Sequence, residues 1–195
     1  DSTTGGISAA GALTLLAAGG VNLNDNLTST GPGTILIDTD TDNDGTSDLT
    51  LASGKTLDTN NNSLMIIAND LFLNGSLNSG TAATTLKISD GSDIGLGYST
   101  GYGMNIEGTE LQNITATNLI LGGATNDNIS VNGITAANSN NISGTLMLNA
   151  TGNGKSVTFL GNSSAFNTLT VNAENGITVN ANLTIDTGNF TADSD

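Results

Sequence analysis

The feature that most constrains this chain is a short apolar–polar–apolar segment that recurs along its whole length. Leu13-Thr14-Leu15, Leu49-Thr50-Leu51, Ile129-Ser130-Val131 and Leu183-Thr184-Ile185 are examples. Because successive side chains of a strand point to opposite faces, each segment places two apolar side chains on one face. Turn-forming Gly, Asn, Asp and Ser separate the segments, and no window has the 3.6-residue apolar period of a helix. The pattern predicts an all-β fold of very short strands.

The segments also recur with a period. Leu13 and Ile35 are 22 residues apart, as are Leu64 and Leu86. A module of about 22 residues cannot bury an apolar face by itself, but stacked modules can. We therefore predict a parallel β-solenoid with rungs of about 22 residues. The inward positions of this solenoid should include Leu13, Leu64, Leu86, Leu146 and Leu169.

The alternative fold is an antiparallel β-sandwich. Asn-Gly pairs such as Asn74-Gly75 and Asn175-Gly176 are typical of tight hairpins. Strands of sandwiches are usually about five to six residues long, however, whereas the segments here mostly have three. Strand length therefore favours the solenoid. The apolar triplets Leu71-Phe72-Leu73 and Leu146-Met147-Leu148 are expected to be buried on both faces.

Composition excludes several classes of function. The chain has no His and no Cys, so it offers no zinc site of the usual nitrogen and sulfur type and no His- or Cys-based catalytic triad. The formal net charge of −15 repels a nucleic-acid backbone. The most apolar stretch, residues 7 to 21, is interrupted by glycines and predicts strands, and no stretch reaches the ~18 apolar residues of a membrane span.

Three runs resemble a known family. TLKISDGSDIGLG (residues 85–97), MNIEGTELQNITATNLILGG (104–123) and LTVNAENGITVNANLTIDTG (169–188) are similar to the repeats of filamentous-haemagglutinin-type bacterial exoproteins. The resemblance implies a right-handed parallel β-helix in a secreted or surface-anchored adhesin. It carries over no catalytic residue. The family's amino-terminal secretion cap is not recognisable in this chain.

Residues 38–48, DTDTDNDGTSD, form the sharpest local signal for a ligand. Alternate carboxylates can converge on a hard cation where a glycine permits a sharp turn, as in calcium loops. The predicted calcium ligands are Asp40, Asp42, Asp44, Asp48 and the carbonyl of Thr46. Position twelve of such a loop is Leu51 rather than a bidentate Glu, and helices do not flank the loop, so it is not an EF-hand. The competing interpretation is a solvated acidic turn.

A second cluster is glycine-rich and contains Tyr98 and Tyr102. Two tyrosines four residues apart could stack on a sugar or a partner protein. The competing interpretation is a loop whose tyrosines pack on the flank of the rod. The spacing of the glycines matches neither dinucleotide-binding nor P-loop motifs, so no cofactor is predicted there.

Carboxylate pairs, such as Glu107 with Glu110 or Asp90 with Asp93, raise the alternative of a polysaccharide-cleaving β-helix enzyme. Such lyases usually need Arg or Lys as the base, and the chain has three Lys and no Arg. We therefore expect no enzymatic activity. A surface-layer or ice-binding solenoid is disfavoured because the Thr-x-Thr pairs do not share one repeat phase.

The resulting expectation is one β-solenoid segment, residues 1–195, belonging to a longer repetitive protein. It would extend and present binding regions of an adhesin at the bacterial surface or outside the cell. Its expected partners are further repeats of the same long chain and glycans or proteins on a host or neighbouring cell. Calcium is the one expected cofactor. A carbohydrate-binding β-helix remains the alternative function.

Overall fold

The computed structural model describes residues 5–194, and its regular secondary structure is almost entirely short strands. Every strand pairing in this range is parallel. The prediction of an all-β fold with parallel sheets is therefore confirmed. The antiparallel sandwich is wrong, because the turn at Asn74-Gly75 joins strands of two different sheets instead of closing a hairpin.

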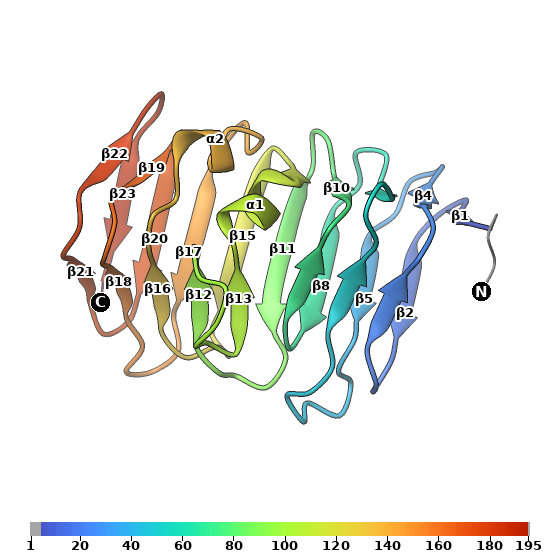
Figure 1. The fold of residues 1–195 in the computed structure, drawn as a ribbon, viewed down its shortest axis with the longest axis horizontal. Coiled ribbons are helices and arrows are strands. Elements are labelled where there is room, and N and C mark those ends of the chain that lie inside the picture. Colours follow the sequence, from blue (N-terminus) through green and yellow to red (C-terminus); the bar gives the residue numbers. More distant parts are fainter. Residues whose placement is uncertain (1–4, 195) are drawn as a thin grey trace.

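The chain visits three sheets in a fixed rotation (Figure 1). Sheet A contains β1 (Ile7–Ala9), β4 (Leu27–Ser29), β7 (Thr56–Asp58), β10 (Ser76–Asn78) and β14 (Ile114–Thr115). Sheet B contains β2 (Leu13–Leu16), β5 (Ile35–Asp38), β8 (Leu64–Ala68), β11 (Ala83–Ile88), β15 (Asn118–Gly123), β17 (Leu146–Ala150), β20 (Leu169–Ala173) and β23 (Phe190–Asp193). Sheet C contains β3 (Val21–Leu23), β6 (Leu49–Leu51) and β9 (Leu71–Leu73).

Two further sheets continue the rotation in the second half of the chain. Sheet D takes the place of sheet C in the rotation and contains β13 (Met104–Ile106), β12 (Ile94–Leu96), β16 (Ile129–Val131), β18 (Val157–Phe159) and β21 (Ile177–Val179). Sheet E takes the place of sheet A and contains β19 (Ser164–Phe166) and β22 (Leu183–Ile185). Two short helices, α1 (Gly108–Gln112) and α2 (Ala136–Ser139), replace turns that the sequence pattern did not distinguish from loops.

The spacing between stacked strands is more variable than predicted. Leu13 pairs with Ile35 as expected. Leu64, however, pairs with Thr84, so that Leu86 lies beside Ile66 rather than beside Leu64. In sheet A the residue after Leu77 in the stack is Ile114. A constant rung of about 22 residues is therefore wrong, because loops of different length leave the stack between strands that stay in register.

One core runs through the whole stack. Its inward-facing side chains form a single hydrophobic cluster, and Leu64, Leu86, Leu146 and Leu169 belong to it, as predicted. Leu13 is only partly buried because β2 is the edge strand of sheet B. The prediction that two apolar triplets are buried on both faces is wrong: Phe72 points outward and is 46% exposed, and Met147 points outward and is partly exposed.

The high Asn and Asp content has a structural explanation at the corners of the stack. We call the turns between sheets corners, and the segment from one strand of sheet B to the next a coil. Side-chain oxygens at the corners accept hydrogen bonds from backbone N–H groups of a neighbouring coil, for example Asn26 from Thr56 N at 2.9 Å and Asp93 from Asn128 N at 2.8 Å. These bonds satisfy backbone donors where the ladders end. Other bonds of this kind join Asp48 to Asp70 N, Asp70 to Asn105 N, Asn118 to Thr145 N, Asn128 to Ser156 N and Asn132 to Asn162 N.

Candidate functional sites

The acidic loop predicted to bind calcium connects β5 to β6. Asp40 is fully buried, and its carboxylate accepts hydrogen bonds from Gly45 N at 3.0 Å, Asp44 N at 3.3 Å and Ser89 Oγ at 2.6 Å. Asn43 and Gly45 have φ values of 54° and 73°, which let the loop fold back on Asp40. Asp40 therefore organises the loop through bonds from its own turn and from a later one.

The structure brings together three of the five predicted calcium ligands. One carboxylate oxygen from each of Asp40, Asp42 and Asp44 lies within 4.8 Å of the others. Asp48 does not join them, because its carboxylate accepts hydrogen bonds from Asn69 Nδ2 and Asp70 N at 3.0 Å. Sequence spacing alone did not reveal this competing structural role.

The residues of the loop differ in their hydrogen bonds and in the pKa of their carboxyl groups. Thr46 donates from its backbone N and its Oγ1 to Asp44, at 3.0 and 2.6 Å. Burial opposes the charged form of Asp40, but the bonds from Ser89 and Gly45 lower its pKa below the ordinary value. Desolvation, the hydrogen bond shared with Asp40 and the charge of Asp44 raise the pKa of Asp42. These three oxygens fit the ligand type that calcium prefers, and calcium binding stays a prediction.

Sequence reasoning missed the contribution of the turn after β11. Ser89 reaches Asp40 from 49 positions away, and a Cβ added at Gly45 would lie 2.7 Å from Asp90 Oδ2. Asp90 is held there by hydrogen bonds from Ser92 N at 2.9 Å and Ser92 Oγ at 2.6 Å. Only the pairing of β5 with β8 and of β8 with β11 could have shown that these two turns meet.

The predicted ligand surface at Tyr98 and Tyr102 lies between β12 and β13. The two ring centroids are 4.7 Å apart, with the rings tilted by 52°. A Cβ at Gly95 would lie 2.4 Å from the Tyr102 ring, so Tyr102 packs directly on the backbone of β12. Burial and the hydrogen bond with Tyr102 raise the pKa of Tyr98 to about 12. The tyrosines are thus packed on the flank and on each other, which leaves no flat two-ring platform.

The carboxylate pairs considered for catalysis are occupied by backbone groups. Glu110 accepts hydrogen bonds from Leu73 N and Glu107 N, both at 3.0 Å, the second as part of the capping box of α1. Burial is the main cause that raises the pKa of Glu110. Asp93 binds Asn128 across the corner of sheet D. These contacts give Glu110 and Asp93 a structural role.

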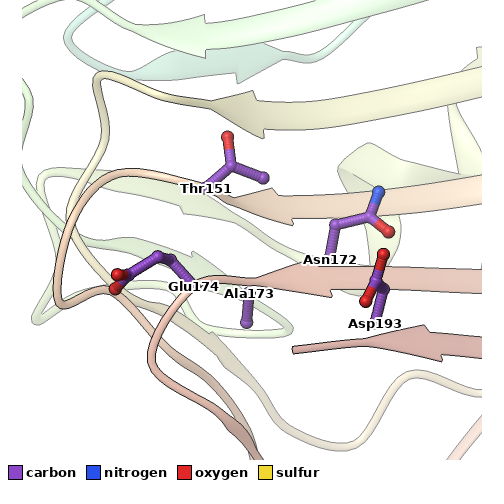
Figure 2. A pocket seen from close by; sticks show the side chains of 5 residues that line it. All are labelled: Thr151, Asn172, Ala173, Glu174 and Asp193. Atoms are coloured by element: carbon purple, nitrogen blue, oxygen red, sulfur yellow. The ribbon is translucent and has the colours of Figure 1, made fainter. Parts of the chain in front are cut away.

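A shallow hollow of about 180 Å³ lies at the end of sheet B near β23. Figure 2 shows Asn172 and Asp193 on adjacent strands, with Thr151 and Glu174 where the strands end. Asn172 Nδ2 donates to Asn149 Oδ1 at 2.8 Å, so outward Asn side chains form a short ladder as expected for a stacked structure. The sequence analysis did not single out this hollow.

The outer faces of the sheets differ in chemistry. Outward side chains of sheet A are polar, including Thr28, Asp58, Asn78 and Thr115. The outer face of sheet B, in contrast, carries an apolar patch. The apolar patch is defined as five partly exposed residues: Leu36, Met65, Ile67, Ile120 and Met147. Thr85, Asn149 and Thr170 lie on the same face, so the outer face of sheet B is mixed in character.

Comparisons with protein-family models, with curated proteins and with solved structures find no match to this chain. Within residues 5–194, neither helix has the length and apolar character that crossing a membrane requires.

Proposed function

We propose that the parallel sheets form a right-handed, three-sided β-helix that serves as a non-catalytic rod of a secreted or surface-bound bacterial adhesin. The observation that carries the proposal is the order of the strands: each turn of the chain adds one strand to sheet B, from β2 to β23. Eight strands at a spacing of about 4.8 Å give a length of about 34 Å between β2 and β23. The two chain ends lie at opposite ends of this stack (Figure 1).

The use of polar side chains supports a structural role. Asp40, Asp70 and Glu110 accept backbone hydrogen bonds, and the side chains of Asp70 and Glu110 are half-buried. A catalytic acid and base need access to a substrate, with oxygens free to exchange a proton. In the proposed rod, these three carboxylates hold backbone segments in place.

Further repeats are the partners proposed for the two ends. At the β23 end, Val179 is 51% exposed and Phe190 is 44% exposed, although the equivalent side chains of inner coils are buried. An additional coil stacked there would cover these side chains and pair the open strand edges. Host or neighbouring-cell glycans and proteins would then bind elsewhere on the adhesin, with Tyr98 and Tyr102 as the alternative glycan surface.

The rod function can be tested through stiffness and adhesion together. Cys residues at Thr14 and Thr170, which occupy one outward row of sheet B, should hold two dyes at a fixed separation, with the backbones about 29 Å apart. The separation should not change on adding glycans. Beads coated with the chain alone should not adhere to cells, whereas a ligand fused to its end should cause adhesion.

Two results would overturn this proposal. Retention of bare beads on glycan surfaces that is lost in a Tyr98→Ala, Tyr102→Ala variant would favour the carbohydrate-binding alternative. Release of reducing sugars from polysaccharides would favour an enzyme, and Glu110→Gln would then identify whether that carboxylate takes part.

A further inference from the structure

We infer that the outer face of sheet B is a lateral self-association surface, on which a second copy of this chain packs face to face. The apolar patch lies on strands β5, β8, β15 and β17. Its side chains alternate with the buried core residues along each strand, so they point outward. Strand β11, between β8 and β15, contributes Thr85 and Lys87 to the same face, so the patch has two parts, one on β5 and β8 and one on β15 and β17. Outer faces of the other sheets are mainly polar, and apolar side chains gathered on one face mark an interaction site.

Charge placement identifies the occupant as a second copy. Asp38, Ile67 and Lys87 occupy one outward row on the adjacent strands β5, β8 and β11, with Ile67 in the middle. At about 4.8 Å per strand, the backbones of Asp38 and Lys87 are about 10 Å apart. Among residues 5–194, Lys55 and Lys155 form ion pairs with Asp25 and Asp127, whereas Lys87 has no carboxylate within 4.0 Å.

A two-fold axis along β8, in the plane between the two sheets, makes this row self-complementary. The rotation places Asp38 opposite Lys87 of the second copy and Lys87 opposite its Asp38. It also places Met65 and Ile67 opposite their own equivalents, whereas Leu36 faces Thr85 of the second copy and Met147 on β17 lies outside the overlap. Isologous interfaces have this property, since one patch must complement itself. A polar or uniformly acidic partner would leave Met65, Ile67 or Lys87 without a matching group.

The size of the overlap sets the expected strength. Five strands, β2 to β15, overlap in this arrangement, about 24 Å across and about 17 Å along the strands. About 400 Å² per copy, or about 800 Å² in total, lies below the range of permanent interfaces and in the class of transient ones. The net charge of −15 on each copy adds repulsion that physiological salt largely screens over distances beyond about 8 Å. We therefore expect a concentration-dependent monomer–dimer equilibrium.

Sedimentation equilibrium of the full chain at 0.15 M NaCl, from 10 to 500 μM, tests the inference. The wild type should form dimers within this range. Ile67→Asn should weaken the dimerisation constant at least tenfold, because the substitution removes an apolar contact at the axis from both copies. The matched control is Phe72→Asn, which removes a large, 46% exposed apolar side chain from sheet C and should leave the constant unchanged.

Charge reversal distinguishes this geometry from unspecific association. Lys87→Glu and Asp38→Lys should each weaken dimerisation. The double variant Asp38→Lys, Lys87→Glu should restore it, because opposite charges then face each other again across the two-fold axis. Circular dichroism must show unchanged strand content in every variant. If Lys87→Glu loses strand content, Lys87→Gln takes its place. A wild type that stays monomeric to 500 μM, or equal effects of Ile67→Asn and Phe72→Asn, would overturn the inference.

Discussion

The corner side chains that link neighbouring coils make a quantitative prediction at Asn128. Its backbone N and Nδ2 donate to Asp93 Oδ1 at 2.8 and 3.2 Å, and its Oδ1 accepts from Ser156 N at 3.0 Å and Ser156 Oγ at 2.9 Å. Asn128 therefore joins the coil of β12 to that of β18 through one partly buried side chain. Asn128→Ala removes three of these four bonds and leaves Ser156 N without its acceptor.

The free energy of unfolding should fall by about 2–4 kcal/mol, since each net hydrogen bond contributes about 0.5–1.5 kcal/mol and an unpaired donor adds to the loss. With a urea m-value of about 2 kcal/mol/M, the middle of the usual range, the unfolding midpoint should fall by about 1–2 M. The measurement is urea unfolding at pH 7, followed by circular dichroism. A drop this large also exceeds the usual effect of a surface substitution, which is about 0.5 kcal/mol.

Two further variants make the result specific. Asn153→Ala is the matched control, because Asn153 is exposed and lies in the turn before β18; its unfolding midpoint should not change. Asn128→Asp keeps an acceptor for Ser156 N but faces Asp93 with a second carboxylate. It should be destabilised at pH 7 and recover at lower pH. If Asn128→Ala unfolds at the wild-type midpoint, corner side chains do not hold the coils together and this explanation of the Asn content is refuted.

Three other predictions concern the loop, the tyrosines and pH. Millimolar calcium should raise the melting temperature of the wild type relative to a chelator, by mass action on the folded state, and should have no such effect in Asp42→Ala, Asp44→Ala; identical wild-type curves would leave only the acidic turn. Gly95→Ala should lower the melting temperature by several degrees, because the new Cβ overlaps the Tyr102 ring, and Gly95→Ala, Tyr102→Ala should recover part of the loss. Burial raises the pKa of Glu110 in the folded state above its ordinary value of 4.5, which applies to the unfolded state. Between the ordinary and the raised pKa, Glu110 is therefore protonated more fully in the folded state than in the unfolded state. Its contribution to stability should therefore increase as pH falls from 7 through this window; Glu110→Gln should flatten that part of the urea-midpoint profile, and an unchanged profile would contradict the assignment.

Much of the fold followed from local pattern. Alternation in Leu49-Thr50-Leu51 and Ile129-Ser130-Val131 determines which side chains face inward, and both triplets bury their apolar pairs. Turn-forming residues marked the strand ends. Register was less predictable, because pairing of Leu64 with Thr84 depends on the packing of entire coils and not on a sequence period. Phe72 points outward by the same alternation, because Leu71 and Leu73 on either side of it face inward, and no further layer among residues 5–194 covers the outer face of its strand.

The candidate site was predictable only in its local part. Asp40, Asp42 and Asp44 meet because they lie within five residues of one loop. Asp48 lies outside this cluster because its partners, Asn69 and Asp70, belong to the next coil. Ser89 and Asp90 escaped notice for the same reason, since a sequence pattern does not show which turns of a stack become neighbours. Gly95 gave no sequence signal for its contact with Tyr102 either.

The loops between stacked strands differ in length, but the inward contacts of the strands that they connect stay the same. Leu86 lies beside Leu121 and Leu169 beside Phe190, so steps of very different length end in the same type of inward contact. An evolving gene can therefore lengthen a connection between two strands without moving the next strand out of register. The same tolerance makes such connections suitable points for grafting foreign peptides, for display at defined positions along the stack.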